Sequence, residues 1–349
     1  MSLYLVQGHG PGYRESVVEA PLVETRNLTK SFPVGGRLRP GGREELVAVE
    51  DVSLRIRRGE TTGLVGESGS GKSTFGRLLL QLYAPTSGDI LFEGKSVLQR
   101  SARATRELRK RIQVVFQDPY ASLNPTMTVR QMLREVLSVH AICAKEARDA
   151  RVAELLERVG LASQLADRRP HQFSGGQRQR IGIARALAVE PDFIVADEAV
   201  SSLDVSVQAQ VLNLMMRLQD ELGLTYLFIS HNLGVMQHIS REVAVMYLGR
   251  IVEQAPTEEL FAEPLHPYTQ ALLRAAPKPV PVRKTITPAV GGDIPSPIDR
   301  PSGCHFHPRC PFAMAICKVE YPAPRHVAPG RTVACHLYED GSTVPKPST

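Results

Sequence analysis

Residues 66–74, which read Gly-Glu-Ser-Gly-Ser-Gly-Lys-Ser-Thr, constrain the fold of this chain more than any other stretch. They follow the apolar run Thr61–Val65, which predicts a short strand. Apolar residues then recur at the helical spacing Phe75, Leu78, Leu79 and Leu82. A glycine-rich turn at a helix start directs backbone N–H groups toward an anion at the positive end of the helix dipole. The stretch fits the pattern G-x-x-x-x-G-K-[ST] at every position and predicts a nucleotide site rather than an ordinary turn.

Two residues of this phosphate loop carry distinct chemistry. The Lys72 ammonium is expected to reach the β- and γ-phosphates of a bound nucleotide, and the Ser73 hydroxyl to ligate Mg²⁺. The remaining residues offer backbone N–H groups. The predicted nucleotide-binding residues of the loop are Gly66, Glu67, Ser68, Gly69, Ser70, Gly71, Lys72, Ser73 and Thr74.

Composition narrows the class of protein. The chain has 349 residues, which suggests two or three domains. Its 42 Lys and Arg against 36 Asp and Glu give a net charge of +6 without a dense basic run. This balance predicts a soluble protein, compatible with work beside an anionic membrane surface. No apolar run approaches ~18 residues, and Met1–Gly8 lack the features of a signal peptide, so we expect the protein in the cytosol.

Hydrophobic patterning divides the chain into an irregular arm at 1–21, a large α/β domain at 22–262 and a C-terminal extension at 263–349. Strands are expected at Leu22–Phe32, Leu46–Ile56, Gly88–Gly94, Ile112–Phe116, Phe193–Ala196, Thr225–Ser230, Val243–Tyr247 and Ile251–Glu253. The first three predict a small, mostly antiparallel sheet, and the last two a hairpin through Gly249. Helical faces at 129–137 and 152–159, with Gly160 as a stop, predict a helical subdomain over about 119–187. Seven prolines between 277 and 301 indicate a linker or extended tail.

Five further features follow the phosphate loop, and their order carries more weight than any one of them. Gln117 ends a strand, where its amide is either a contact to Mg²⁺ and the attacking water or simply a polar surface group. Ser174-Gly175-Gly176-Gln177 opens a helix with a Ser N-cap. It is either a second phosphate-binding helix start or ordinary capping.

The strand Phe193–Ala196 ends in two carboxylates. Asp197 suits the Mg²⁺ shell, and Glu198 can accept a proton from a water that attacks the γ-phosphate. An exposed acidic strand end is the alternative. Ser201 and the run Ser202-Leu203-Asp204 follow, and His231 stands after another strand, where it is either a γ-phosphate partner or structural.

With these motifs in this order, the sequence strongly resembles the ATP-binding subunit of ABC transporters from about Leu22 to Pro256. The resemblance implies a P-loop ABC ATPase: a RecA-like α/β core with an antiparallel β-subdomain and a helical subdomain, here followed by a small Cys-containing C-terminal domain. It makes Phe173–Gln177 the signature motif and Ser202–Asp204 the dimer loop. Phe32 matches the aromatic that stacks on adenine, with a core position as the alternative.

The same resemblance implies a mechanism. Two subunits pair head to tail, and the signature of each closes over ATP held by the phosphate loop of the other. ATP then holds the dimer together, and hydrolysis opens it. Catalysis is assigned to Glu198, His231 and Gln117, with Mg²⁺ held by Ser73, Gln117 and Asp197. Ala199 stands where many relatives have Pro, which leaves the catalytic groups intact but could loosen the loop that follows.

A closer resemblance is to the ATPases of oligopeptide and dipeptide importers, a group that includes nickel-type relatives. The matching stretches are Val115–Pro125, Phe228–Leu233, His266–Leu273, Gly292–Pro297 and Cys304–Pro311. This branch implies peptide uptake, with a sister ATP-binding subunit, two transmembrane permease subunits and a substrate-binding protein as partners. It implies a peripheral position on the cytoplasmic face of the cell membrane and no nucleic-acid partner.

The cysteines are concentrated in the C-terminal extension. Cys304, Cys310, Cys317 and Cys335 have the spacing C-x5-C-x6-C-x17-C, whereas Cys143 stands alone and is expected in the core. Four thiolates can hold a [4Fe–4S] cluster or tetrahedral Zn²⁺. The spacing lacks the C-x-x-C pairs usual for zinc, and some relatives of this branch carry a cluster. Free or buried thiols are the third alternative, and His305 and His307 are candidate substitute ligands.

Three other functions compete with peptide import. The first is import of another small solute such as nickel. The second is a soluble ABC ATPase that acts on nucleic acid or ribosomes, but such proteins usually carry two cassettes or a long coiled-coil insert, and the sequence has neither. The third is a metal-bearing C-terminal module that only senses or docks.

Overall fold

The computed structural model describes residues 20–34, 44–98, 100–118, 123–275 and 295–338. Its strands are β1 (Val23–Val34), β2 (Glu44–Ile56), β3 (Thr61–Val65), β4 (Ser87–Phe92), β5 (Lys95–Ser96), β6 (Ile112–Val115), β7 (Phe193–Asp197), β8 (Thr225–Ser230), β9 (Glu242–Tyr247), β10 (Arg250–Pro256), β11 (Arg325–Ala328) and β12 (Arg331–Val333). Its α-helices are α1 (Lys72–Leu79), α2 (Ala102–Arg111), α4 (Val129–Val139), α5 (Arg148–Arg158), α6 (Gly175–Leu187), α7 (Val205–Leu222), α8 (Leu233–Ile239), α9 (Thr257–Ala262) and α10 (Pro267–Ala275).

The described strands form two sheets. The smaller one has the order β2-β1-β4-β5 with antiparallel pairs, so the predicted antiparallel sheet is confirmed. The larger has the order β11-β12-β10-β9-β3-β8-β7-β6, and its members from β9 to β6 are parallel. Because β7 and β3 both flank β8, the loops after these three strands share one edge of the sheet, where ligands of open α/β sheets bind.

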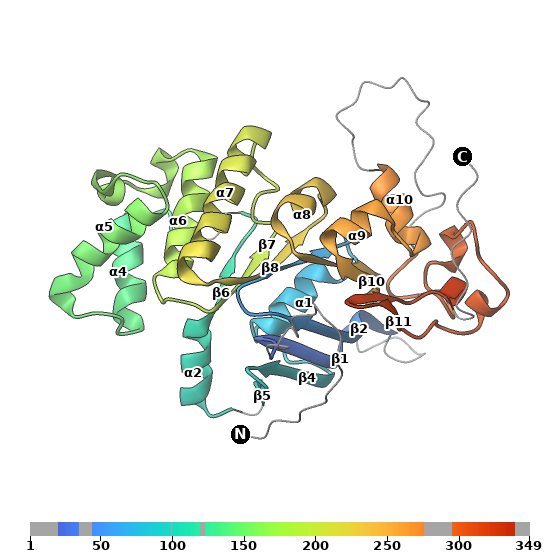
Figure 1. The fold of residues 1–349 in the computed structure, drawn as a ribbon. Helices are drawn as coiled ribbons and strands as arrows, with labels where there is room; N and C mark the ends of the chain where they lie inside the picture. The colour runs from blue at the N-terminus through green and yellow to red at the C-terminus, as the bar shows by residue number, and fades with distance from the viewer. Residues whose placement is uncertain (1–19, 35–43, 99, 119–122, 276–294, 339–349) are drawn as a thin grey trace, which may run out of the picture.

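Helices α4, α5 and α6 lie together at one end of the molecule, beyond β6 (Figure 1). They confirm the helical periods at 129–137 and 152–159, and Gly160 adopts a left-handed φ of 71° just after α5. Residues 119–122 lie outside the described residues. Helix α2 was not predicted, since its sequence ARATRELRKR offers one buried residue, Leu108, and no apolar stripe.

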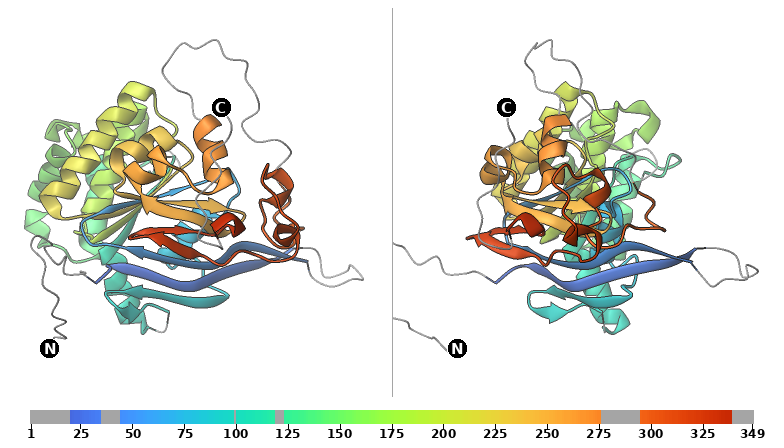
Figure 2. Two further views of the ribbon diagram at one scale, coloured as in Figure 1. Left: turned by 45° about the vertical axis from the view of Figure 1, so that its right-hand side comes forward. Right: turned by 90° about the vertical axis from the view of Figure 1, so that its right-hand side faces the viewer.

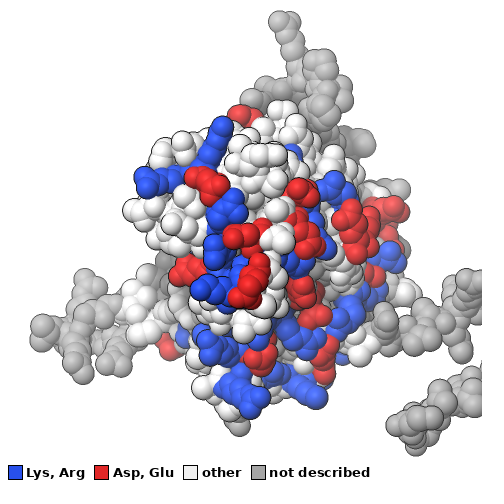
Figure 3. All heavy atoms as spheres, turned by 90° about the vertical axis from the view of Figure 1, so that its left-hand side faces the viewer, with Lys and Arg blue, Asp and Glu red and all other residues white. Residues whose placement is uncertain are grey.

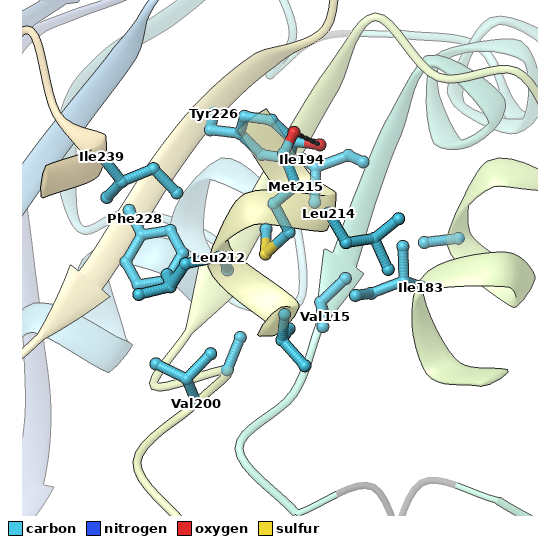
Figure 4. Close-up of a cluster of buried hydrophobic side chains, with 14 of the residues drawn as sticks. Val115, Ile183, Ile194, Val200, Leu212, Leu214, Met215, Tyr226, Phe228 and Ile239 are labelled. Carbon is cyan, nitrogen blue, oxygen red and sulfur yellow. Dashed lines mark hydrogen bonds between the residues drawn. The ribbon is translucent and has the colours of Figure 1, made fainter. Parts of the chain in front are cut away.

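The main hydrophobic core joins the larger sheet to the helices that cover it. Figure 4 shows Met215 and Leu212 of α7 packed beside Phe228 of β8 and Ile194 of β7, with Ile183 of α6 completing this layer. The buried Tyr226 hydroxyl donates to the Met215 carbonyl at 3.4 Å, which satisfies its polar end within the core. Cys143 packs at the margin of this core, as predicted.

The C-terminal segment 295–338 folds back onto the α/β core. Its hairpin β11–β12 pairs with β10 through Glu253↔Val333 and Gln254↔Thr332, so it extends the larger sheet. Figure 2 shows this segment, in red, alongside the strands of the core. The linker or extended tail was predicted for 277–301, and its described part, 295–301, forms neither helix nor strand. The paired strands and short 3-10 turns lie after it, between 307 and 338. The prolines at 277, 279, 281 and 288 lie outside the described residues.

At two of the boundaries that differ from the predicted ones, an apolar residue expected inside an element is exposed. Helix α1 ends at Leu79, and Leu82 is 56% exposed because Gln81 turns the chain with a positive φ of 55°. Strand β6 ends at Val115, and Phe116 is 39% exposed. Since β6 is the edge strand of the sheet, its end is not covered by a neighbour on both sides.

The surface at the α4–α5 end carries charges of both signs, interspersed with each other (Figure 3). Several are paired, such as Arg130 with Asp167 at 2.8 Å and Arg151 with Glu154 at 2.7 Å. In the part of the chain that the structure describes, no helix has both the length and the apolar character to cross a bilayer.

Candidate ATP-binding and hydrolysis site

The phosphate loop lies between the end of β3 and the start of α1, as the sequence predicts. Gly71 is the N-cap of α1 with a φ of 104°, and a Cβ there would lie 2.1 Å from the Ala48 carbonyl oxygen of β2. Only glycine fits this left-handed backbone and this close approach. The loop is also tied to the turn between β9 and β10, because the Gly249 N–H donates to the Ser70 carbonyl at 2.9 Å.

Lys72 points back into the loop. Its ammonium donates to the carbonyls of Gly66 and Glu67, both at 2.8 Å, and to the Ser70 hydroxyl at 3.3 Å. The residue is 5% exposed, and this burial lowers the Lys72 pKa against the opposing influence of Glu198, Asp197 and Glu67. An ammonium held against the backbone of a glycine-rich loop at a helix start is suited to bind phosphate.

Two of the three predicted Mg²⁺ ligands, Ser73 and Asp197, meet in the structure. The Ser73 hydroxyl donates to Asp197 Oδ1 at 3.0 Å. Burial raises the pKa of Asp197, and the Ser73 hydrogen bond opposes this. A hydroxyl and a carboxylate at this distance, both at the end of the parallel strands, are hard oxygen ligands of the kind Mg²⁺ prefers.

Glu198 and His231 form the second pair at this edge. His231 Nδ1 lies 3.3 Å from Glu198 Oε1, although the two residues end different strands. Glu198 has a positive φ of 51°, and this conformation is held by its N–H bond to Ile229 at 2.9 Å and by the Ser201 hydroxyl on its carbonyl at 2.9 Å. Such strain in a non-glycine residue is concentrated at functional sites. The pair can orient a water and take its proton.

Gln117 and the dimer loop are neighbours. The Ser202 hydroxyl donates to the Gln117 carbonyl at 3.1 Å, and both side chains are exposed. Leu203 packs at the margin of the main core, while Asp204 is the N-cap of α7. Ala199, whose place Pro takes in many relatives, is fully buried, and Ser201 holds the loop after it.

The signature motif is a complete helix start. Ser174 accepts a hydrogen bond from the Gln177 N–H at 3.3 Å, and the Gln177 side chain accepts from the Ser174 N–H at 3.0 Å. Phe173 is buried, and a Cβ on Gly176 would lie 2.4 Å from Val207 Cγ1 of α7. Gly175 likewise lies beside Leu203 of the dimer loop. Among the described residues, no hydrogen bond or ion pair joins Phe173–Gln177 to the phosphate loop of the same chain.

Phe32 is half-buried on β1, outside both large clusters of core residues, so a core position is the wrong alternative. Its ring meets Tyr83 edge-to-face at 5.4 Å, and Lys30 Nζ lies 4.9 Å from the ring centre. Part of the ring is thus accessible, and stacking on adenine stays a prediction.

The four C-terminal cysteines line one small cavity of about 10 Å³, together with His266, His307, His336 and Phe306. Burial raises the pKa of Cys304 to about 11 and that of Cys335 to about 12, which favours the protonated thiols. Across the described ranges, no group of three or more His, Cys, Asp or Glu side chains is arranged to hold a metal ion. The predicted metal centre is therefore not supported by this arrangement. The His305 ring instead meets the Tyr321 ring edge-to-face, with the ring centres 5.1 Å apart.

Sequence reasoning missed two residues that touch the phosphate loop. The Tyr268 hydroxyl accepts from the Glu67 N–H at 2.8 Å, and the Arg309 guanidinium binds the Glu67 carboxylate at 2.8 and 2.9 Å. Tyr268 lies in α10, and Arg309 lies in the C-terminal segment 295–338. Both lie in stretches that carry the importer resemblance, His266–Leu273 and Cys304–Pro311, but nothing in those stretches indicates a contact with Glu67.

Comparison with known families agrees with this geometry. Residues 49–201 match the ABC transporter family, and residues 252–317 match the oligopeptide/dipeptide transporter C-terminal region. Two solved structures are similar: cbiO1 from Clostridium perfringens, with 29% identity and a TM-score of 0.61 over 70% of this chain and 92% of that one, and the ATP-binding cassette MJ0796 in a dimer bound to ADP and Pi, with 29% identity and a TM-score of 0.60 over 67% and 98%. The fold and the site define an ABC ATPase.

Curated relatives narrow the class. The chain is 51% identical over 321 residues to the oligopeptide transport ATP-binding protein AppF of Bacillus subtilis, which covers 91% of this chain and 97% of that protein. It is 50% identical over 316 residues to the probable peptide ABC transporter ATP-binding protein y4tS of Sinorhizobium fredii, 90% of each chain. This chain therefore belongs to the ATP-binding proteins of peptide ABC transporters, and the family resemblance seen in the sequence is confirmed.

Proposed function

We propose that this protein binds Mg²⁺-ATP at the phosphate loop and hydrolyses it to power the uptake of peptides through a membrane permease. One observation carries the proposal: Ser73 with Asp197 and Glu198 with His231 form two close pairs at the edge of the sheet where the phosphate loop lies. The peptide substrate is supported by the names of the relatives and by the match of residues 252–317.

Each group of the site has a task. Lys72 and the loop N–H groups bind the phosphates, with Lys72 releasing its bonds to the Gly66 and Glu67 carbonyls in favour of phosphate oxygens. Ser73, Asp197 and Gln117 hold Mg²⁺, which neutralises phosphate charge when bound. Glu198 takes a proton from the attacking water, and His231 orients the carboxylate of Glu198 and contacts the γ-phosphate. Phe32 stacks on the adenine.

Catalysis needs two chains. In the proposed head-to-tail dimer, the exposed Ser174 and its helix start face the phosphates held by the partner, and Ser202–Asp204 lies along the interface. The 83%-exposed Val205, next to Asp204, supports an interface there, since such an apolar side chain is better covered. We propose a sister ATP-binding subunit as the partner rather than a second copy.

The remaining partners follow from the branch. Two transmembrane permease subunits bind the ATPase pair at the cytoplasmic face of the membrane, and a substrate-binding protein delivers the peptide. The experiment is co-expression of this chain with the permease subunits and sister ATPase encoded beside it, followed by purification and peptide uptake into proteoliposomes. Peptide-stimulated ATP hydrolysis and uptake are expected. A complex that transports only nickel, or a chain that copurifies with ribosomes and not with the permease, would overturn the proposal.

We further propose that Cys304, Cys310, Cys317 and Cys335 act as one unit, since they line one cavity. To hold Zn²⁺ or a [4Fe–4S] cluster, the four thiols would have to lose their protons and move together, because the described side chains are not arranged around a metal ion. A single ion requires less movement of the side chains around a cavity of about 10 Å³ than a four-iron cluster does. The protein should be purified without oxygen, with iron, sulfide and zinc quantified beside the visible spectrum. About four irons per chain and a broad visible absorbance would identify the cluster, and one zinc per chain would identify the single ion. If neither metal is found, the four cysteines are free thiols.

A further inference from the structure

Glu67 is an acidic residue inside a loop built to receive a polyanion. Its charge acts on the Lys72 ammonium, so the two side chains lie close enough to interact electrostatically. A free carboxylate at this position would repel the phosphates of ATP, because like charges in a partly buried site are weakly screened. The site therefore functions well only if the Glu67 charge is neutralised and its side chain is held in place.

Arg309 does both. Its two terminal nitrogens donate to the two carboxylate oxygens of Glu67 at 2.8 and 2.9 Å, a bidentate geometry. The Arg309 side chain is 5% exposed and that of Glu67 is 21% exposed, so water screens the pair little. The rings of Tyr247 and Phe306 flank the guanidinium at 5.9 and 5.8 Å, which fixes its position.

Tyr268 holds the backbone of the same residue. Its hydroxyl accepts the Glu67 N–H at 2.8 Å, and its ring is fully buried against Tyr247 at 4.6 Å and Phe306 at 5.4 Å. One aromatic cluster thus supports both contacts. We call the contacts of Arg309 and Tyr268 with Glu67 the Glu67 clamp.

We propose that Arg309 and Tyr268 are positioning residues for ATP binding. The C-terminal segment 295–338, which we also call the C-terminal module, then acts on the nucleotide site through the Glu67 clamp. The inference rests on the proposed role of Gly66–Thr74 in ATP binding. Arg309 ends the single turn His307–Arg309, which lies between Cys304 and Cys310. Any change in the shape of this cysteine-bearing segment therefore moves the group that neutralises Glu67.

The test measures the Kd of a fluorescent, non-hydrolysable ATP analogue for the full-length chain. Arg309→Gln leaves the Glu67 charge unpaired and is expected to weaken binding roughly tenfold. The double variant Glu67→Gln/Arg309→Gln has lost both charges and should return to within roughly threefold of the wild type, because the repulsion is gone. Arg309→Lys keeps the positive charge but cannot make the bidentate contact, so its Kd should lie between those of the wild type and Arg309→Gln.

A matched control removes another ion pair between the C-terminal module and the core. Arg300 pairs with Glu50, which keeps Arg250 as a second partner at 2.9 Å, so Arg300→Gln should leave the Kd unchanged. Tyr268→Phe keeps the ring but loses the acceptor for the Glu67 N–H, and should weaken binding by roughly threefold. Higher ionic strength should shrink the Arg309→Gln defect, since it screens the free Glu67 charge.

Two results would overturn the proposal. One is wild-type affinity in Arg309→Gln; the other is a double variant as weak as Arg309→Gln, which would mean that Arg309 acts only by supporting the fold. Thermal unfolding of each variant separates loss of stability from loss of affinity. If Arg309→Gln does not fold, the Kd values of Arg309→Lys and Tyr268→Phe test the proposal instead. Failure of the proposed function looks different, because the wild type and Lys72→Ala would then bind the analogue equally.

Discussion

The chain contains two helix starts of similar local design, and their surroundings differ. The phosphate loop before α1 is enclosed: Lys72 is 5% exposed, Gly249 holds the loop at Ser70, and the Glu67 clamp closes it from the C-terminal side. The signature motif before α6 is open: Ser174 is exposed, and its capping bonds are made with Gln177 of the same turn. An enclosed anion site is complete within one chain, whereas an open helix start is suited to a ligand that another molecule brings. The difference fits the proposed head-to-tail pair, in which each chain supplies one half of a site.

The largest expected effect comes from the enclosed site. Glu198→Gln removes the proton acceptor and should lower the ATPase rate of the assembled complex by about 10²–10⁴-fold, with the ATP-bound dimer accumulating. The rate is measured by phosphate release and the dimer by light scattering. Glu190→Gln is the matched control, because Glu190 also has a positive φ, of 55°, but lies outside the site. An unchanged rate in Glu198→Gln would remove this residue as the base.

Lys72→Ala should act on binding rather than on the chemical step. Without the ammonium, the affinity of the isolated chain for ATP should fall roughly 10²-fold, since a buried charged partner of the phosphates is lost. A titration with the fluorescent ATP analogue measures this, and Lys110→Ala, which alters a surface ion pair with Glu107, serves as the control. Equal affinities of Lys72→Ala and the wild type would show that the loop does not hold the nucleotide.

At the signature motif, a substitution should change the ATPase rate of the complex and not the ATP affinity of the isolated chain. Ser174→Asp keeps a capping side chain but places a negative charge at the helix start, so it should leave ATP binding to the isolated chain unchanged. The ATPase rate of the assembled complex should nevertheless fall roughly tenfold, because the charge meets the phosphates held by the partner. Ser174→Asn, which caps without the charge, is the control. Weaker ATP binding by isolated Ser174→Asp would contradict the division between an enclosed and an open site.

The smallest effect concerns how the C-terminal module is attached near the enclosed site. Burial alone would raise the pKa of Glu50, but hydrogen bonds and charges of Arg250 and Arg300 outweigh it and lower the pKa to about 2. A lowered pKa means that the carboxylate stabilises the folded chain above about pH 4.5, and that this contribution disappears as the pH falls toward 2. Glu50→Gln should therefore lower the melting temperature by about 2–4 °C at pH 7 and by less at pH 4. An equal loss at both pH values would exclude the ion pairs as the cause.

Much of the nucleotide site could be predicted because its motifs are local. Glycines at 66, 69 and 71, an ammonium at 72 and a hydroxyl at 73 follow from the backbone and charge that a phosphate needs within a few residues. The predicted N-cap Ser174 is likewise contained in one helical turn. The structure confirms it and adds the reciprocal bond of the Gln177 side chain. The strand ends at Asp197 and Ser230 were visible as apolar runs followed by polar residues, since alternation and length are properties of the strand itself.

The tertiary structure decided what lies beyond this range. The order β3-β8-β7 brings Ser73 to Asp197 and Glu198 to His231, and the positive φ of Glu198 is set by its bonds to Ile229 and Ser201. The hairpin β11–β12 became part of the larger sheet because β10 would otherwise present an unpaired edge. Glu67 and Arg309 are 242 positions apart, and neither carries a local signal of the other. Local motifs are fixed by a few bonds along the chain, whereas ion pairs of this kind depend on how separate segments pack, which periodicity and spacing do not encode.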